Sequence, residues 1–274
     1  MPKCHALGCF YAVAISGAEN AVQNREAGVR NLVNTYIAPI QAAADAFLWL
    51  VYPDGCMICK EASGPFLCDR CADDLLVPFP ALVCSTCGHP RQVLPCRRCQ
   101  MSPPAYVATR AASPLAGELA QVIHHFKYHD RPQLALPLGR LLARHALGIR
   151  HSLGDLSFDR VTCVPMLRSR ERARGYNQAD RLARVTAAEL RLSYAPDLLK
   201  RAKRTRPQVG LHREQRQSNI EGAFVATGKP SVTGLRILVI DDVSTTGATL
   251  DACAVALREA GAAAVYGLAL AAGG

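Results

Sequence analysis

The sequence predicts an α/β fold, a Rossmann-like parallel sheet covered by helices and preceded by a small cysteine-rich zinc-binding module. Eight of the twelve cysteines form four CxxC pairs in residues 56–99. Beyond these pairs, strand-like and helix-like apolar segments alternate along the chain. The length of 274 residues and the hydrophobic content of 50% are those of a globular protein with a substantial core. They exclude a fibrous or wholly disordered chain.

The N-terminal residues are the least informative part of the sequence. We expect residues 1–38 to be a poorly ordered extension, because the apolar stretch at 6–15 imitates a signal peptide without a clear cleavage signal. Residues 39–52 repeat apolar side chains at helical spacing and predict a short amphipathic helix. We expect a cytoplasmic protein, since free thiolates suit a reducing compartment and no run reaches the roughly 20 apolar residues of a membrane span.

The zinc-binding module is predicted at residues 53–102. Its cysteines repeat the spacing C-x2-C-x8-C-x2-C twice, with the second copy shifted by 28 residues. Two cysteines at i and i+3 can direct both sulfurs at one ion, and a second pair completes a tetrahedral site. The predicted ligands are Cys56, Cys59, Cys68, Cys71, Cys84, Cys87, Cys96 and Cys99.

Zinc is the expected ion because it prefers four soft ligands, and a fully thiolate site leaves no open position, which indicates a structural role. An iron–sulfur cluster is the alternative. Disulfides are disfavoured because tight CxxC pairs have poor geometry for structural bridges. The assignment of the CxxC pairs to ions stays open. Each repeat binds one ion by itself, or the two repeats interleave their ligands around two ions in a cross-braced arrangement, or only one of the two sites is real. His89, beside the second repeat, is expected to be a solvated loop histidine rather than a substitute ligand.

An α/β domain is expected at residues 103–274, after a tandem proline that marks a linker. Strands and helices are expected to alternate, which predicts a parallel sheet with helices packed on it. The expected strands are 105–112, 160–166, 236–241 and 263–270, and the expected helices are 115–126, 134–147, 176–192 and 246–260.

The sharpest chemical signal is the segment ILVIDDVSTTGAT at residues 237–249. Four apolar residues predict a buried strand that ends in Asp241 and Asp242, and a hydroxyl-rich loop then opens a helix. Ligands of open α/β sheets bind at the carboxyl ends of strands, and helix N-termini attract phosphate. Adjacent carboxylates would repel a phosphate unless they bind hydroxyl groups or a divalent cation. A ribose 5-phosphate with free hydroxyls and Mg²⁺ meets that requirement.

The formal charge of +10 belongs to one part of the chain. Residues 165–218 contain fourteen Lys and Arg against five Asp and Glu, a net charge of +9. A concentrated positive charge favours a polyanionic partner such as nucleic acid, polyphosphate or a phosphorylated metabolite. The alternative is a solvated charged helix face.

Residues 237–249 resemble the phosphoribosyl-pyrophosphate (PRPP) binding motif of type I phosphoribosyltransferases. The four CxxC pairs, together with FKY at 126–128 and RGYNQ at 174–178, resemble the ComF family of competence and DNA-utilisation proteins. The resemblance covers about residues 40–274. It implies a type I phosphoribosyltransferase fold, PRPP binding with Mg²⁺, and a part in natural transformation or the handling of incoming single-stranded DNA.

The resemblance also implies roles for residues. Asp241 and Asp242 would be catalytic and contact the ribose hydroxyls, the loop at 243–249 would hold the 5-phosphate, and residues 165–168 would wrap the pyrophosphate. Lys127 and Arg172 are candidates to offset the pyrophosphate charge. The expected PRPP-binding residues are Val243, Ser244, Thr245, Thr246, Gly247, Ala248, Thr249, Pro165, Met166, Lys127 and Arg172.

Residues 201–217 correspond to a mobile flap over the site, whose closure would keep water from the anomeric carbon. The same basic residues would suit non-specific contact with single-stranded DNA, although the run is poor in aromatic residues for base stacking. The expected flap or nucleic-acid contacts are Arg201, Arg204, Arg206, Arg213 and Arg216.

Three functions stay open. The first is a PRPP-dependent transferase of nucleotide metabolism, with an acceptor that the sequence does not reveal. The second is a PRPP-binding, DNA-handling protein, with other DNA-uptake or recombination proteins as further partners. The third is a purely structural zinc adaptor, against which the intact acidic pair and hydroxyl loop argue. A likeness of fold does not by itself establish an activity.

Overall fold

The structure is a computed structural model, and it describes residues 55–61, 66–79, 82–90, 96–152, 157–202 and 222–273. The extension expected at 1–38 and the helix expected at 39–52 lie outside the described residues. Residues 55–274 belong to one compact unit. The expected division at residue 103 stays a prediction. No helix of the described ranges is both long and apolar enough to cross a bilayer.

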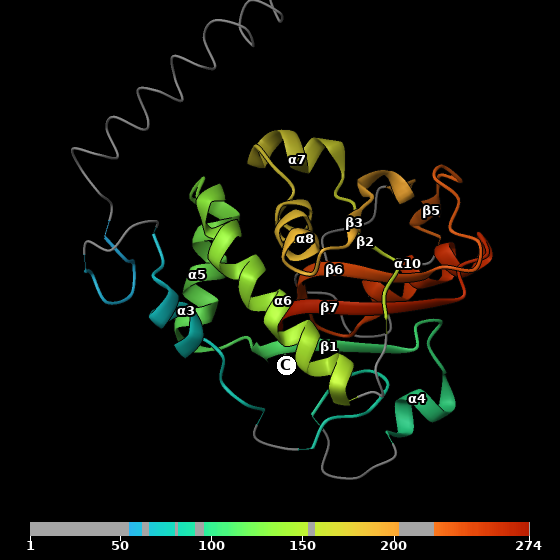
Figure 1. The fold of residues 1–274 in the computed structure, drawn as a ribbon, viewed down its shortest axis with the longest axis horizontal. Helices are drawn as coiled ribbons and strands as arrows, with labels where there is room; N and C mark the ends of the chain where they lie inside the picture. The colour runs from blue at the N-terminus through green and yellow to red at the C-terminus, as the bar shows by residue number, and fades with distance from the viewer. Residues whose placement is uncertain are drawn as a thin grey trace, which may run out of the picture. The chain divides into compact units, whose positions relative to one another are not determined.

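Five strands of the described residues form one parallel sheet in the order β1-β7-β6-β2-β3 (Figure 1). The residues of β6 from Ile237 to Ile240 are all buried. A run that is apolar at every position suits a strand that is covered on both faces. The strands are β1 (Ala108–Pro114), β2 (Arg160–Cys163), β3 (Ser193–Tyr194), β6 (Arg236–Ser244) and β7 (Ala264–Ala272).

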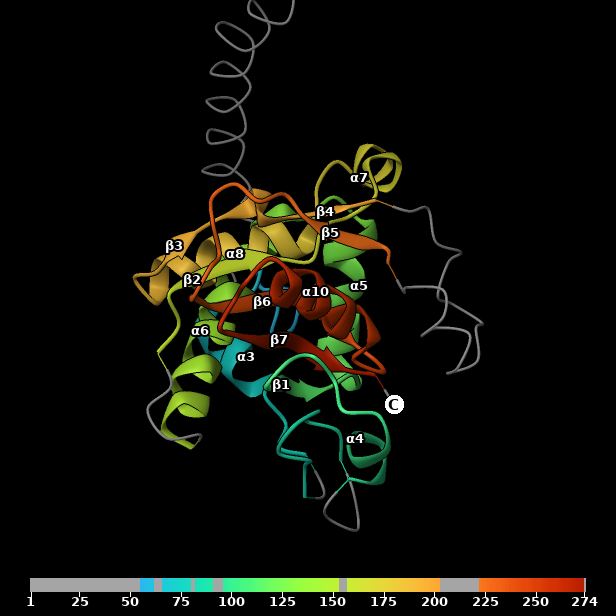
Figure 2. The same cartoon turned by 90° about the vertical axis from the view of Figure 1, so that its right-hand side faces the viewer.

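Helices cover both faces of the sheet (Figure 2). On one face lie α5 (Gly117–Tyr128), α6 (Ala135–Ser152) and α8 (Gln178–Glu189), and on the other lies α10 (Ala248–Glu259). A crossover between parallel strands is right-handed, and the β2–β3 and β6–β7 crossovers run in opposite directions across the sheet. The helices α8 and α10 therefore take opposite faces.

The same reversal creates a topological switch point between β2 and β6. The chain leaves β2 toward one edge of the sheet and leaves β6 toward the other. The loops after these strands diverge and leave a crevice at their carboxyl ends, which is where doubly wound sheets bind ligands. Both of the loops for which the sequence predicts ligand contacts, after β2 and after β6, start at this crevice.

Shorter elements surround the crevice and the first strand. The helix α7 (Arg168–Arg174) follows β2, and an antiparallel pair is formed by β4 (Leu199–Arg201) and β5 (Phe224–Ala226). The helices α3 (Asp69–Asp74) and α4 (Arg97–Met101) belong to the cysteine-rich segments. Two 3₁₀ turns lie at Pro132–Leu134 and Pro196–Leu198.

The predicted α/β class with a parallel sheet is confirmed, and the element boundaries differ in one informative place. The strand expected at 236–241 continues to Ser244, because Val243 and Ser244 pair with Ala271 and Ala272 of β7. The following helix begins at Ala248 rather than 246. The acidic pair is therefore part of the sheet, and only residues 245–247 separate strand from helix.

The cysteine-rich segments pack on β1, the edge strand. The Thr109 N–H donates to the Thr86 carbonyl (2.8 Å), and the Val77 N–H donates to the Ser113 hydroxyl (3.1 Å). Backbone groups at the edge of a sheet need such partners, because unpaired edges invite association with other chains. The cysteine-rich segments therefore satisfy part of the free edge of the sheet.

Candidate functional site

A cavity of about 960 Å³ lies at the switch point. Its walls come from the ends of β2, β4 and β6, from the C-terminal end of α5, and from α7. The lining residues are Lys127, Tyr128, Asp130, Val164, Pro165, Met166, Arg170, Ala173, Arg174, Gly175, Asn177, Ala179, Arg201, Asp241, Asp242, Val243, Thr245 and Thr249.

Asp241 and Asp242 form what we call the acidic wall. Successive side chains of a strand point to opposite faces, so the two carboxylates have different hydrogen-bond partners. The Lys127 Nζ of α5 donates to Asp242 Oδ1 (2.9 Å), and these side chains are only 20% and 14% exposed. Asp241 Oδ1 accepts a hydrogen bond from the N–H of Asp242 (2.9 Å), and the positive charge of Arg201 lowers the pKa of the Asp241 carboxyl.

The environment of Asp241 favours its protonated form. Burial raises the pKa of Asp241 to about 7, and the negative charge of Asp242 acts in the same direction. Lys127, the Asp242 N–H and Arg201 lower this pKa without overcoming burial. A carboxyl in this state can release a proton when a cation arrives, because the cation replaces the proton as the neutralising charge.

The residues 244–249, which we call the hydroxyl loop, connect the acidic wall to α10. Gly247 precedes the helix with φ +76°, a left-handed conformation that favours glycine. The Thr246 hydroxyl accepts the N–H of Ala248 (3.3 Å), and Thr245 and Thr249 line the cavity. The first N–H groups of α10 and the positive end of its dipole are suited to an anion at this position.

Three arginines form what we call the basic wall. Arg170 and Arg174 are one helical turn apart on α7, and both line the cavity. Arg201, at the end of β4, also lines it, and its guanidinium lies 5.2 Å from the Phe224 ring centroid. Guanidinium groups bind phosphate oxygens through paired hydrogen bonds. This wall therefore faces the acidic wall with the charge that a diphosphate needs.

The RGYNQ and FKY motifs hold the two walls in place. The Tyr176 hydroxyl and the Gln178 Nε2 both donate to the Phe126 carbonyl at the end of α5. The Asn177 side chain caps α8 and donates to the Val164 carbonyl (3.1 Å) after β2. Arg174 donates to Gln178 (2.9 Å). The motifs thus fix α7 and the Lys127 end of α5 relative to β2.

One aromatic side chain stands at the rim of the cavity. Tyr128 is 63% exposed, and the guanidinium carbon of Arg174 lies 4.9 Å from its ring centroid. The ring of His124 also lies near, with 5.0 Å between the His124 and Tyr128 centroids. An exposed aromatic ring beside an arginine is a suitable surface for stacking a nucleobase.

The structure brings most of the expected ligand residues together. Lys127, Pro165, Met166 and Arg201 line the cavity with the acidic wall, and so do Val243, Thr245 and Thr249 of the following segment. The side chains of Ser244, Thr246, Gly247, Ala248 and Arg172 are not among the lining residues. Arg204, Arg206, Arg213 and Arg216, and the flap beyond Ala202, lie outside the described residues.

The sequence analysis did not identify Arg170, Arg174 or Tyr128 as site residues. Arg174 and Tyr128 belong to the RGYNQ and FKY motifs, but the motifs by themselves do not predict a role for either side chain. A signal was available in α7, whose arginines alternate so that Arg170 and Arg174 share one face and Arg168 and Arg172 the other. The sequence alone did not say which face meets the cavity.

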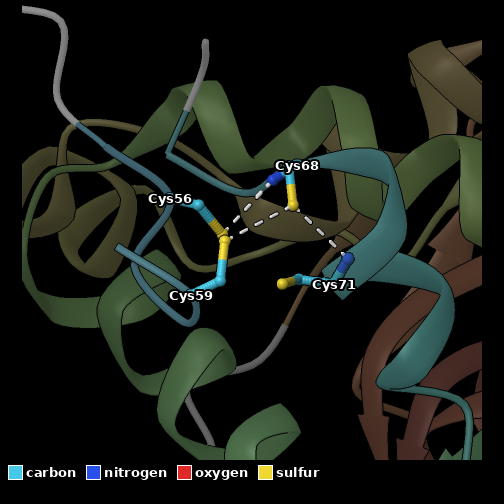
Figure 3. A group of neighbouring side chains, drawn as sticks. All are labelled: Cys56, Cys59, Cys68 and Cys71. Atoms are coloured by element: carbon cyan, nitrogen blue, oxygen red, sulfur yellow. Dashed lines mark hydrogen bonds between the residues drawn. The ribbon is translucent and has the colours of Figure 1, made fainter. Parts of the chain in front are cut away.

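The eight CxxC cysteines fall into two groups. Cys56, Cys59, Cys68 and Cys71 form the first cluster, in which the four side chains converge (Figure 3). The second cluster contains Cys84, Cys87, Cys96 and Cys99. In each cluster all sulfurs lie within 4.8 Å of one another, so each repeat closes on itself and the cross-braced pairing is excluded.

The clusters have the dimensions of a tetrahedral thiolate site. Zn–S bonds of about 2.3 Å place sulfurs roughly 3.8 Å apart along a tetrahedral edge. The Cys59 and Cys68 sulfurs are 3.9 Å apart, and those of Cys87 and Cys96 are 4.0 Å apart. In the first cluster, the N–H groups of Cys68 and Cys71 donate to sulfurs of Cys56 and Cys68. These bonds support thiolate charge in the first cluster, and the convergence of four sulfurs means that both clusters could hold a metal ion.

Comparison with proteins of known name gives matches over most of the chain. DNA utilization protein YhgH of Salmonella typhimurium is 32% identical over 221 residues, 79% of this chain and 96% of that protein. YhgH of Escherichia coli is 31% identical over the same shares. Competence protein F of Haemophilus influenzae is 30% identical over 198 residues, 71% of this chain and 85% of that protein. No family model matches the chain.

Comparison with solved structures gives partial matches. Glutamine PRPP amidotransferase from B. subtilis matches 53% of this chain and 30% of its own, with a TM-score of 0.36 and 20% identity. UMP synthase of Leishmania donovani matches 53% of this chain and 22% of its own, with a TM-score of 0.29 and 22% identity. The chain therefore spans less than a third of either protein.

Proposed function

The chain belongs to the family of DNA utilization protein YhgH and Competence protein F, and from this premise we propose that it binds PRPP with Mg²⁺ and handles incoming single-stranded DNA in natural transformation. One observation carries the PRPP part. A carboxylate pair and a hydroxyl loop at a helix N-terminus share one cavity with three arginines.

Each part of PRPP has a counterpart in this cavity. The 5-phosphate suits the hydroxyl loop, where Thr245 and Thr249 line the cavity beside the start of α10. The ribose hydroxyls are donors that suit the oxygens of the acidic wall, and Mg²⁺ prefers carboxylate and phosphate oxygens. The pyrophosphate suits the basic wall. The cavity volume is in the range of small-molecule sites.

Lys127 connects the acidic wall to the pyrophosphate in this proposal. In the absence of ligand it neutralises Asp242. When Mg²⁺ takes over that neutralisation, the ammonium group becomes available to the pyrophosphate oxygens. Arg172, the other residue expected to meet the pyrophosphate, is exposed on the far side of α7 from the lining arginines. We assign that role to Arg170 and Arg174 instead.

The DNA part of the proposal is supported by the rim of the cavity. Tyr128 offers a stacking surface, and Arg168 and Arg172 extend positive charge over the exposed face of α7. Aromatic rings beside a basic surface suit single strands of any sequence. Contacts to phosphates release counterions, so the affinity for DNA should fall as salt is added.

We further propose that each cysteine cluster holds one zinc ion with a structural role. All four positions of each cluster are thiolates, which leaves no site for a substrate. Elemental analysis of reduced, purified protein should find two zinc ions per chain. Such clusters require a reducing environment, and we place the protein in the cytoplasm.

The test of the proposed ligand is a calorimetric titration of the whole chain with PRPP and Mg²⁺. The wild type should bind, and Asp241→Asn/Asp242→Asn should not. Absence of binding by the wild type would end the PRPP proposal, and unchanged binding by the double variant would show that the ligand sits elsewhere. Release of pyrophosphate with a nucleobase present, together with no affinity for single-stranded DNA, would favour a transferase of nucleotide metabolism.

A further inference from the structure

A histidine joins the second cysteine cluster to the hydroxyl loop. His89 follows Cys87 by two residues and is half-buried. Its Nε2 donates a hydrogen bond to the carbonyl oxygen of Thr245, and its Nδ1 lies 3.3 Å from the carbonyl oxygen of Cys87. The solvated loop histidine expected from the sequence is thus a bridge between the cysteine segment and the cavity.

Two neighbouring contacts strengthen the same connection. The N–H of Ala105 donates to Asp251 Oδ1 (2.7 Å) in the first turn of α10. Tyr106 is only 3% exposed, and its hydroxyl lies 3.1 Å from where a Cβ on Gly247 would be. The segment after α4 therefore lies against the start of α10.

The other side of this bridge is anchored to the sheet. The Thr109 hydroxyl donates to the Cys87 carbonyl (3.0 Å), and the Thr109 N–H donates to Thr86. Gly88 lies so close to β1 that a Cβ there would be 2.4 Å from the Thr109 carbonyl oxygen. Only glycine fits this approach. The CxxC turn is thus held between β1 and the hydroxyl loop.

The first cluster has different neighbours. Asp73 of α3 pairs with Arg144 of α6, Val77 bonds to Ser113 at the end of β1, and the Phe66 ring lies 4.3 Å from the Arg131 guanidinium. These contacts join the first cluster to α6, to β1 and to the segment before α6. The two clusters share a ligand spacing but not an attachment.

We infer that the second cluster fixes the hydroxyl loop, with His89 as the positioning residue, so that its metal occupancy sets the affinity for the 5-phosphate group. A bound ion ties Cys84 and Cys87 to Cys96 and Cys99 and so restrains the turn that precedes His89. The His89 ring then meets the Thr245 carbonyl in one position, which orients the N–H groups that follow. The inference rests on the proposed binding of PRPP for its ligand but not for the coupling itself.

The first test compares His89→Ala with His89→Gln, because the glutamine amide nitrogen can donate from about the position of the histidine Nε2. We expect His89→Ala to keep two zinc ions, to weaken ribose 5-phosphate binding about tenfold, and to leave inorganic pyrophosphate binding within twofold. His89→Gln should recover most of the loss. An equal loss for both ligands, or no recovery with glutamine, would show that His89 has only a general structural role.

The second test removes one metal at a time. Cys84→Ser/Cys87→Ser and Cys56→Ser/Cys59→Ser should each lose one zinc ion. Only the former should speed amide hydrogen exchange at residues 243–249 and weaken ribose 5-phosphate binding about tenfold. The same response from both would refute the inference. Should the serine variants not fold, hydrogen exchange of His89→Ala gives the answer without touching a metal ligand.

The exchange measurement needs no ligand, so the outcomes separate the two proposals. Faster exchange at 243–249 in His89→Ala, with no PRPP binding by the wild type, would retain the coupling and reject the proposed ligand. Unchanged exchange and unchanged ribose 5-phosphate binding would reject the coupling and retain the ligand.

Discussion

The acidic and basic walls of the cavity differ in how the chain supports them. Asp241 and Asp242 belong to β6, which pairs with β7 from Arg236 to Ser244 and with β2 from Ile237 to Ile240. Arg170 and Arg174 belong to the seven-residue helix α7, which has no buried residue of its own. One wall is part of the core sheet, and the other is attached to it through the RGYNQ motif.

This difference suggests a division of labour. Groups on a central strand are held with little freedom, which suits recognition of the ribose and a metal ion at fixed positions. Groups on a surface helix that is anchored through the residues following its C-terminal end have more freedom than those on a central strand, which suits contact with a diphosphate or a strand of nucleic acid. The four expectations below test this division, beginning with the largest effect.

Removal of the inner arginines of α7 should have the largest effect. Arg170→Ala/Arg174→Ala should weaken PRPP binding about 100-fold, since each charge-assisted contact contributes on the order of 1.5 kcal/mol. The matched control is Arg168→Ala/Arg172→Ala, which removes the same charge from the other face. Calorimetric titration with PRPP measures the loss of affinity in each double variant. Similar losses in both would mean that only the total charge of α7 matters.

Removal of Lys127 should mainly affect the acidic wall. Lys127→Ala leaves Asp242 largely buried without its cation, and we expect the free energy of unfolding to fall by about 2 kcal/mol, roughly 30-fold in the equilibrium constant. Denaturant titration at pH 7 measures it. Lys127→Ala/Asp242→Asn should recover most of the stability but not PRPP binding. If the double variant is as unstable as Lys127→Ala, the unpaired charge of Asp242 is not the cause of the lost stability.

The acidic wall should also confer a pH dependence. Because the pKa of Asp241 is raised to about 7, its proton must leave when Mg²⁺ binds. Affinity for PRPP with Mg²⁺ should therefore rise about tenfold between pH 6 and pH 8 and level off above that range. The slope should vanish in Asp241→Asn and persist in Arg170→Ala. Affinity that falls with rising pH would contradict this protonation state.

The smallest effect concerns DNA at the rim. Tyr128→Ala should weaken binding of a short oligothymidine about fivefold in fluorescence anisotropy at fixed salt, because one stacking surface is lost. Tyr128→Phe, which keeps the ring, is the control and should bind like the wild type. PRPP binding by Tyr128→Ala should change less than DNA binding does. A larger change in PRPP binding than in DNA binding would place Tyr128 among the residues that bind PRPP.

Local patterns explain why much of the site could be predicted from the sequence. An apolar run ending in two aspartates, followed by threonines and a glycine, predicts a strand, a ligand-binding loop and a helix within thirteen residues. The resemblance assigns residues 165–168 to the ligand, and the structure places Pro165 and Met166 in the lining of the same cavity as Asp241. The cysteine spacing likewise predicted the eight clustered cysteines, because they are local in sequence, but it left their pairing open.

The features that could not be predicted depend on distant partners. The length of β6 follows from its pairing with β7, and the orientation of α7 follows from hydrogen bonds to Phe126 and Val164. The role of His89 depends on Thr245, which lies 156 positions away in the sequence. No periodicity or spacing near His89 carries that information.

The pairing of β1 with β7 has a consequence for the order in which the parts assemble during synthesis. Each cysteine cluster has all of its ligands within one short segment, so it can take up metal soon after that segment leaves the ribosome. The partner of β1 is β7, which is made much later. On the edge of β1 away from β7, the Thr109 N–H already has a partner in the cysteine-rich segment, so the edge that pairs with β7 is the one that waits for a partner until β7 is synthesised.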